Sequence, residues 1–316
     1  MTIVVNAFVS TGDARCPWLM VHATDRLVSL RHADRFEPKY PVYNKTVVYR
    51  ACDAIVTMAF TGIAFIDGAP TDEWIASTLA GCRFKQPVGM SFGQDFDVLN
   101  LGQAVSRLAQ SLNMVLKRRA DEEPLALIIA GARRKKGRWR RAAASIERNA
   151  AGRFEARHFR WETRRQWQSR LLVGPRGWLS PDAAQARADQ LSASRSVADV
   201  ERVVDAIVTE AARANPTAVG KDLTGITLLP LASPRLQVVY LHRSDESTFE
   251  GFTPLMLGPR TVHLPAAVTA PIAMSLDGVQ IQWRPVGLCD APTGREAPVT
   301  NGLVFSFRTH PDREHL

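Results

Sequence analysis

The first 80 residues alternate apolar and polar positions in short runs that are separated by turn residues. TIVVNAFV (2–9), WLMVHATDRLVS (18–29) and KTVVYRACDAIVTMAF (45–60) are rich in β-branched residues, so this stretch predicts two successive hairpins. Pro70, Thr71 and the acidic residues Asp72 and Glu73 follow. A proline, a hydroxyl residue for the cap and acids in the first turn are typical of a helix start.

The pattern changes period twice in the next 160 residues. From Val98 to Lys117 the apolar residues recur every three or four positions, which predicts an amphipathic helix, and the same holds from Val197 to Asn215. Ser180 and Pro181 predict one more helix start. Strands are predicted at PLALIIAGA (124–132), in a basic hairpin that turns near 136–137, at SRLLVG (169–174), and at GITLLPL (225–231) and RLQVVYLH (235–242).

The order is therefore strands, two helices, strands, two helices, strands. Two sheets that pack face to face, with a helix layer outside each, would bury every apolar stripe. We expect an α/β (α+β) protein: a four-layer αββα sandwich of two mainly antiparallel sheets flanked by helix pairs. Residues 1–244 would form this domain, and 245–316, with short strand-like runs between prolines and glycines, would form a β-rich C-terminal extension.

Composition adds few constraints. The chain has 316 residues, of which 46% are hydrophobic and 22% charged, as in ordinary globular proteins. No apolar run approaches the roughly 20 residues that span a bilayer, and the start lacks the features of a secretory signal. The four cysteines are widely scattered and lack CxxC spacing, so we expect free thiols and a cytoplasmic protein: Cys16, Cys52, Cys82 and Cys289. We expect no membrane association, no metal and no cofactor.

The net charge of +9 is concentrated between Arg133 and Arg170. Arginines there alternate with aromatic residues, an arrangement that can bind phosphates and stack bases: Trp139, Phe154, Phe159, Trp161 and Trp167. The alternation in RFEARHFRW also fits a strand with a solvated outer face and an aromatic inner face. We favour that second interpretation, so we do not expect nucleic acid as a partner. A basic surface could equally attract acidic partners.

Thr2 becomes the first residue if Met1 is removed. A threonine hydroxyl needs an adjacent base, which the α-amine of the same residue can provide. That amine has a pKa of roughly 7.7–8.0, and a neighbouring ammonium would lower it. Lys45 is the candidate ammonium, with Asp25 as its carboxylate partner and Lys39 as the competing lysine.

TIVVNAFV, ATDR, the lysine in NKTVV and TMAFTGIA together resemble the catalytic front end of proteasome β-type subunits and the HslV peptidase, which are N-terminal nucleophile hydrolases. The resemblance implies that Thr2 is the nucleophile, Asp25 and Lys45 its supporting pair, and Gly62 the backbone N–H for the oxyanion. It covers residues 1–244 and implies the same αββα fold.

The resemblance also implies a substrate site and a supporting turn. Val28, Phe60 and Ala64 would line a specificity pocket, and Ser29 would hold the substrate backbone. TAVGKDLTGI (217–226) is similar to the Asp-x-x-Ser-Gly turn of the family and assigns supporting roles to Asp222 and Thr224. The serine of the family's Gly-Ser-Gly segment is absent from VGPRG (173–177), and Ser180 is the nearest replacement.

Two functions follow from these observations. The first is a threonine hydrolase that cleaves amide bonds in a peptide or a small amide, as a homo-oligomer whose partner ATPase the sequence does not define. The second is a non-catalytic, proteasome-like scaffold or ring subunit, with the basic stretch as a surface for nucleic acid or another partner.

Overall fold

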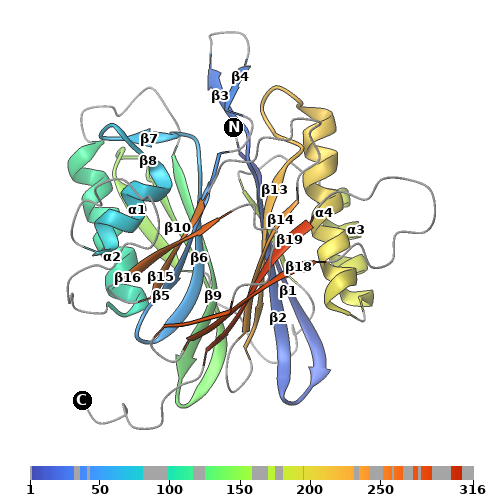
Figure 1. Cartoon of the computed structure of the whole chain (residues 1–316). Helices are drawn as coiled ribbons and strands as arrows, with labels where there is room; N and C mark the ends of the chain where they lie inside the picture. The colour runs from blue at the N-terminus through green and yellow to red at the C-terminus, as the bar shows by residue number, and fades with distance from the viewer. Residues whose placement is uncertain are drawn as a thin grey trace.

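A computed structural model gives the fold, and its description covers residues 2–31, 36–40, 43–80, 99–116, 125–158, 170–174, 181–194, 196–230, 235–241, 252–257, 260–265, 273–276, 279–286 and 300–307. Two large sheets dominate this part of the chain (Figure 1). Helices α1 and α2 lie on one side of the sheets, and α3 and α4 lie on the opposite side.

The larger sheet has the strand order β12-β1-β2-β13-β14-β19-β18-β17, and each neighbouring pair is antiparallel. Its strands are β1 (Val4–Asp13), β2 (Cys16–Asp25), β12 (Arg170–Gly174), β13 (Leu223–Leu229), β14 (Arg235–Leu241), β17 (Ala273–Leu276), β18 (Val279–Val286) and β19 (Thr300–Phe307). The register sets Val4 opposite Thr24 and Thr24 opposite Thr224, so the start of β1, the end of β2 and the start of β13 lie together.

The second sheet has the order β11-β10-β9-β6-β5-β15-β16. Its strands are β5 (Thr46–Arg50), β6 (Ala54–Thr61), β9 (Ala126–Lys135), β10 (Arg138–Arg148), β11 (Phe154–His158), β15 (Phe252–Leu257) and β16 (Arg260–Pro265). Two short ribbons accompany the sheets, β3 (Val28–Arg31) with β4 (Phe36–Tyr40), and β7 (Phe65–Ile66) with β8 (Ala69–Pro70).

Each sheet has its own hydrophobic core beneath a helix pair. One core joins the second sheet to α1 (Thr71–Ala80) and α2 (Leu101–Val115). The other joins β1, β2 and β13 to α3 (Pro181–Ala193) and α4 (Val197–Ala214). Because the apolar stripes of α2 and α4 face these cores, burial of apolar surface holds both helices to their sheets.

Local sequence explains where the helices begin. Asn100 and Ser196 each form a capping box, with Gln103 and Asp199 as their partners. Thr71 differs from its expected role as a cap, because it is the first residue of α1 and its hydroxyl donates to the carbonyl of Ile63 at 2.9 Å. Thr71 therefore ties the helix start to the segment that follows β6.

The predicted mixed α+β class with mainly antiparallel sheets is confirmed. The predicted basic hairpin is also present, and its turn has Lys136 at φ 50° and Gly137 at φ 71°. Strands β15 and β16 add to the second sheet beside β5, with β15 parallel to β5, whereas β17–β19 add to the larger sheet beside β14. The division at residue 244 stays a prediction. No helix in the described segments is long and apolar enough to cross a membrane.

Candidate functional site

The strand ends described above bring an aspartate into contact with four donors. Asp25 is the last residue of β2 and is fully buried. Its Oδ1 accepts a hydrogen bond from the backbone N–H of Ile3 at 3.0 Å. Its Oδ2 accepts from Lys45 Nζ at 2.9 Å and from the N–H groups of Gly220 and Leu27 at 3.0 and 3.1 Å. These four bonds satisfy a charge that burial would otherwise penalise.

Lys45 immediately precedes β5 and is 1% exposed. Its ammonium donates to Asp25 and to the carbonyl of Leu27. Burial lowers the pKa of Lys45, and Asp25 opposes this effect only in part. Lys45 is thus the lysine that pairs with Asp25, whereas the side chain of Lys39 lies outside the described residues.

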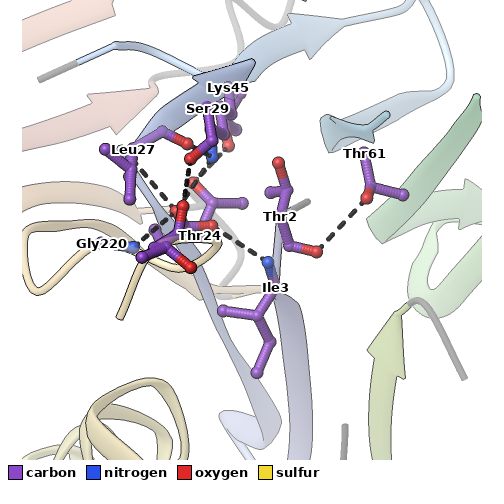
Figure 2. Close-up of polar contacts among 11 residues, drawn as sticks. Thr2, Ile3, Thr24, Leu27, Ser29, Lys45, Thr61 and Gly220 are labelled. Atoms are coloured by element: carbon purple, nitrogen blue, oxygen red, sulfur yellow. Dashed lines mark hydrogen bonds and ion pairs between the residues drawn. The ribbon is translucent and has the colours of Figure 1, made fainter. Parts of the chain in front are cut away.

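Thr2 lies beside this pair, and the backbone around it is held from both sheets. The N–H of Ile3 donates to Asp25, and the carbonyl of Thr2 accepts from the hydroxyl of Thr61 at 3.3 Å. Figure 2 shows Thr2 between the group around Lys45 and the Thr61 side chain. The Thr2 residue is 4% exposed, and the described contacts include no hydrogen bond between its hydroxyl and Lys45.

Gly62 follows the last residue of β6, so it directly follows Thr61, which contacts Thr2. It is exposed and has a φ of 100°, in the left-handed region that favours glycine. The next residues are anchored, since the carbonyl of Ala64 accepts from Thr71 N–H at 2.9 Å and from the Tyr43 hydroxyl at 3.0 Å. An exposed backbone N–H on an anchored loop can serve as a donor to a ligand.

Asp222 immediately precedes β13, Thr224 is the second residue of that strand, and both are buried. The carbonyl of Asp222 accepts from Arg26 N–H at 3.0 Å, next to Asp25. Thr224 pairs with Thr24 across the strands. Its hydroxyl is buried and has no hydrogen-bond partner among the described residues.

The four predicted substrate contacts lie in different surroundings. Val28 is buried at the start of β3, and half-buried Ser29 donates from its hydroxyl to the carbonyl of Thr217 at 2.5 Å. Ala64 is half-buried on the loop after Gly62. Phe60 is 1% exposed and belongs to the core under α1 and α2.

A buried polar network next to the pair has no signal in the sequence. His22 contacts Asn6 through Nδ1 at 2.8 Å and Thr46 through Nε2 at 3.0 Å, and Thr46 contacts Thr24 at 3.1 Å. Burial lowers the pKa of His22 to about 3, so the imidazole is neutral near pH 7. Thr46 belongs to the second sheet, whereas Asn6, His22 and Thr24 belong to the larger sheet. The network therefore joins the two sheets next to Asp25 and Lys45.

Gly220 is a further residue that sequence reasoning missed. A Cβ at this position would lie 2.7 Å from Cβ and 3.0 Å from the N of Leu27. Only glycine therefore allows the N–H of residue 220 to approach Asp25. A single glycine in TAVGKD gives no sign of this contact, because the partner segment lies nearly 200 residues away.

Asp72 forms a second buried acidic position near the site. Its Oδ2 accepts from the amide of Asn44 at 2.8 Å, while Oδ1 is buried and has no hydrogen-bond partner among the described residues. Burial raises the pKa of Asp72 to about 7. Asn44 adjoins Lys45, so Asp72 supports the segment that carries the lysine.

Residues 175–180, which include most of the expected Gly-Ser-Gly region and Ser180, lie outside the described residues. Cys16 and Cys52 are free thiols, and Cys82 and Cys289 are not among the described positions. Within the described ranges, no group of three His, Cys, Asp or Glu side chains could hold a metal ion.

Comparison with known proteins gave matches among solved structures alone. No family model matches the chain, and no curated protein matches it. Among similar structures is an Anbu mutant from Hyphomicrobium sp. strain MC1, with a TM-score of 0.42 and 11% identity over 72% of this chain and 82% of that one. Another is Anbu (ancestral beta-subunit) from Yersinia bercovieri, with a TM-score of 0.43 and 14% identity over 73% and 82%. A third is the helical assembly of the Anbu complex from Pseudomonas aeruginosa, with a TM-score of 0.45 and 14% identity over 78% and 88%.

These findings correct the family expected from the sequence. The identification as an N-terminal nucleophile hydrolase of the proteasome β-subunit and HslV type is wrong, because the similar structures are Anbu proteins and no family model matches. The physical reason lies in the motifs. A threonine, an Asp-Arg pair, a lysine and a Thr-Gly pair all stand at strand ends, where small polar residues and glycine are common in many folds.

Proposed function

We propose that this protein is a threonine hydrolase that cleaves amide bonds, with Thr2 as the attacking residue after removal of Met1. One observation carries the proposal: a buried Lys45–Asp25 pair at 2.9 Å, whose carboxylate also holds the N–H of Ile3, next to Thr2. A buried ion pair is costly to desolvate, and a perturbed lysine beside a hydroxyl is a common feature of catalytic sites.

The chemistry needs a free α-amine on Thr2. The Thr2 hydroxyl would attack the amide carbonyl, and the α-amine would accept the hydroxyl proton. The amine then passes the proton to the leaving nitrogen as the C–N bond breaks, which leaves an ester on Thr2. Water hydrolyses the ester with the same amine as base. The N–H of Gly62 would stabilise the oxyanion in both steps.

The remaining predicted residues would position these groups. Asp25 would hold Lys45, whose ammonium lowers the pKa of the nearby amine and favours its basic form. Asp222 and Thr224 would support the strand end opposite Asp25. Substrate contacts stay assigned to the residues after β2, in β6 and in the loop that follows it: Val28, Ser29, Phe60 and Ala64.

We propose that residues 1–244 form a four-layer αββα domain and that 245–316 form an extension that adds strands to both sheets. Two separate helix-covered cores and side-chain contacts between the sheets support it, among them Thr24 with Thr46. We place the protein in the cytoplasm as a homo-oligomer that acts on a peptide or a small amide, without a cofactor.

A covalent probe tests the proposal. A β-lactone or an epoxyketone should add to the native chain once per subunit, and peptide mapping should locate the adduct on Thr2. Thr2→Ala should abolish the adduct and the turnover of amide substrates. Its urea midpoint of unfolding should equal that of the wild type. Thr2→Ser, which keeps a hydroxyl, should retain labelling. An intact mass that includes Met1 throughout the native population, or labelling of Thr2→Ala, would exclude Thr2 as the nucleophile.

The burial of Thr2 favours a second candidate, a non-catalytic scaffold or ring subunit. Its 4% exposure leaves little of the residue accessible to an extended peptide. In this role Asp25 and Lys45 would only join the two sheets. The probe experiment distinguishes the two candidates, because a scaffold forms no adduct at any probe concentration. Light scattering would show that the oligomer of the unlabelled protein is intact.

A further inference from the structure

Residues 133–141 form a two-stranded basic ribbon at the end of the molecule opposite Thr2. Strand β9 begins at Ala126, opposite Thr61, and runs away from it to Lys135 (Figure 1). At about 3.4 Å per residue, its far end is roughly 30 Å from the Thr61 end. Strand β6 pairs with β9 only as far as Arg133, and β11 pairs with β10 only from Ala144 onward. Among the described residues, the ribbon therefore extends beyond the strands on either side of it.

Four cations share one face of this basic ribbon. The register sets Arg133 opposite Arg140, and Lys135 opposite Arg138. Residues directly opposite in an antiparallel pair lie on the same face, and so do alternate residues along a strand. The four side chains form a two-by-two array, with about 5 Å between opposite residues and about 7 Å between alternate ones. All four are exposed.

This array opposes the stability of the ribbon, because like charges directly opposite each other repel. Asp53 pairs with Arg133 at 2.7 Å. In the described part of the chain no carboxylate pairs with the other three cations, Lys135, Arg138 and Arg140. Three uncompensated positive charges on one flat face constitute a site for an anion with several regularly spaced negative groups.

We propose that the basic ribbon binds the phosphate backbone of a double-stranded nucleic acid without sequence preference. Three of the four cations are arginines, whose planar guanidinium groups bind phosphate oxygens in pairs. A duplex presents one charge per about 1.7 Å of its axis, so a compact array meets several phosphates at once. The β-turn at 136–137 keeps the ribbon narrow enough to follow a groove.

The aromatic residues near the basic ribbon favour the duplex over a single strand. Trp139 pairs with Arg134 and thus lies on the face opposite the four cations. Phe154 is buried, with the guanidinium of Arg148 stacked 4.4 Å from its ring. Neither ring can stack bases beside the array. The described residues of the cation face therefore provide contacts to phosphate alone.

Fluorescence anisotropy of a labelled 30-base-pair DNA duplex, titrated with the full chain, tests this proposal. Phosphate contacts from the three cations without a carboxylate partner predict a slope of about −2.7 for log K against log salt, a loss on the order of 40-fold between 50 and 200 mM. The triple variant Lys135→Gln, Arg138→Gln, Arg140→Gln should remove most of this salt dependence and abolish measurable binding at 200 mM salt.

A matched control removes the same charge elsewhere. Arg157→Gln, Arg202→Gln and Arg213→Gln lie on β11 and α4, and this variant should bind as the wild type does. The ribbon variant should melt at an unchanged or higher temperature, since it relieves repulsion. Equal binding by the two triple variants would overturn the proposal. So would equal affinity for a 30-residue oligothymidylate, or equally effective competition by polyglutamate, which would assign the face to single strands or to acidic proteins.

Discussion

One end of the central strands carries an oppositely charged pair, and the other end carries an array of like charges. At the end near Thr2, Asp25 and Lys45 are buried, and every carboxylate oxygen of Asp25 is bonded. At the other end, Arg133 faces Arg140 and Lys135 faces Arg138 in water. The first arrangement is maintained by packing and backbone donors, whereas the second is tolerated because water and salt screen it.

The difference shows how position determines the effect of a charge. Removing one partner of a buried pair leaves an uncompensated charge in a poorly solvated place, which is strongly destabilising. Removing one charge from an exposed array relieves repulsion and costs little. Changes at the Thr2 end should therefore affect stability more and respond less to salt than changes at the ribbon end.

Asp25→Asn should produce the largest effect. It leaves the Lys45 ammonium buried without its carboxylate, so the free energy of unfolding should fall by about 3–5 kcal/mol. Urea denaturation at pH 7 measures this loss. Asp13→Asn, which breaks the exposed pair with Arg15, is the matched control and should leave the urea midpoint nearly unchanged. The double variant Asp25→Asn, Lys45→Met should recover much of the loss, and failure to recover would show that the backbone bonds to Asp25 matter more than the charge.

Asp72 should make stability fall as the pH rises. Its pKa is raised from 3.8 to about 7 in the folded state, so between these values the folded chain binds more protons than the unfolded chain. The stabilising contribution is complete below the unfolded value and decreases by about 1.4 kcal/mol per pH unit up to the folded value. Urea denaturation of the wild type and of Asp72→Asn at pH 5, 6, 7 and 8 isolates the slope. Asp72→Asn should be the more stable protein at pH 8, and parallel curves would contradict the assignment.

Gly220→Ala should cost about 1–3 kcal/mol, because the new Cβ overlaps Leu27 and the 220 N–H withdraws from Asp25. Thermal melting measures the loss, and probe labelling of Thr2 should slow in parallel. Gly102→Ala is the matched control: its Cβ would meet only the side-chain oxygen of Asn100, at 3.3 Å, and alanine favours the helix. Equal destabilisation of Gly102→Ala would contradict the claim that position 220 specifically requires glycine.

Lys135→Gln with Arg138→Gln should give the smallest effect, a rise in the free energy of unfolding below about 1 kcal/mol at low salt. Since salt screens the repulsion that is relieved, the rise should disappear near 1 M NaCl. Urea denaturation at 20 mM and 1 M NaCl makes the comparison. An increase that persists at 1 M salt would point to packing rather than charge as its cause.

Much of the fold was predictable because it depends on local pattern. The helices near 101–115 and 197–214 followed from residues spaced at three and four positions, and their capping residues are close in sequence. The hairpin at 136–137 followed from a Lys-Gly turn between two strands. The role of Thr71 was wrong in detail, because its hydroxyl found a partner in a loop outside the helix. The position of β15 and β19 in two different sheets had no local signal.

By itself the sequence determined the alternation of strands and helices, the basic ribbon and the candidate residues Thr2, Asp25 and Lys45. Only the tertiary structure decided that Lys45 pairs with Asp25, that Gly220 and Leu27 complete the carboxylate's bonds, and that His22 joins the sheets. The physical reason is range. Propensity and periodicity act over a few residues, whereas a buried charge is satisfied by whichever donors the packed chain brings to it, here from segments as much as 195 positions apart.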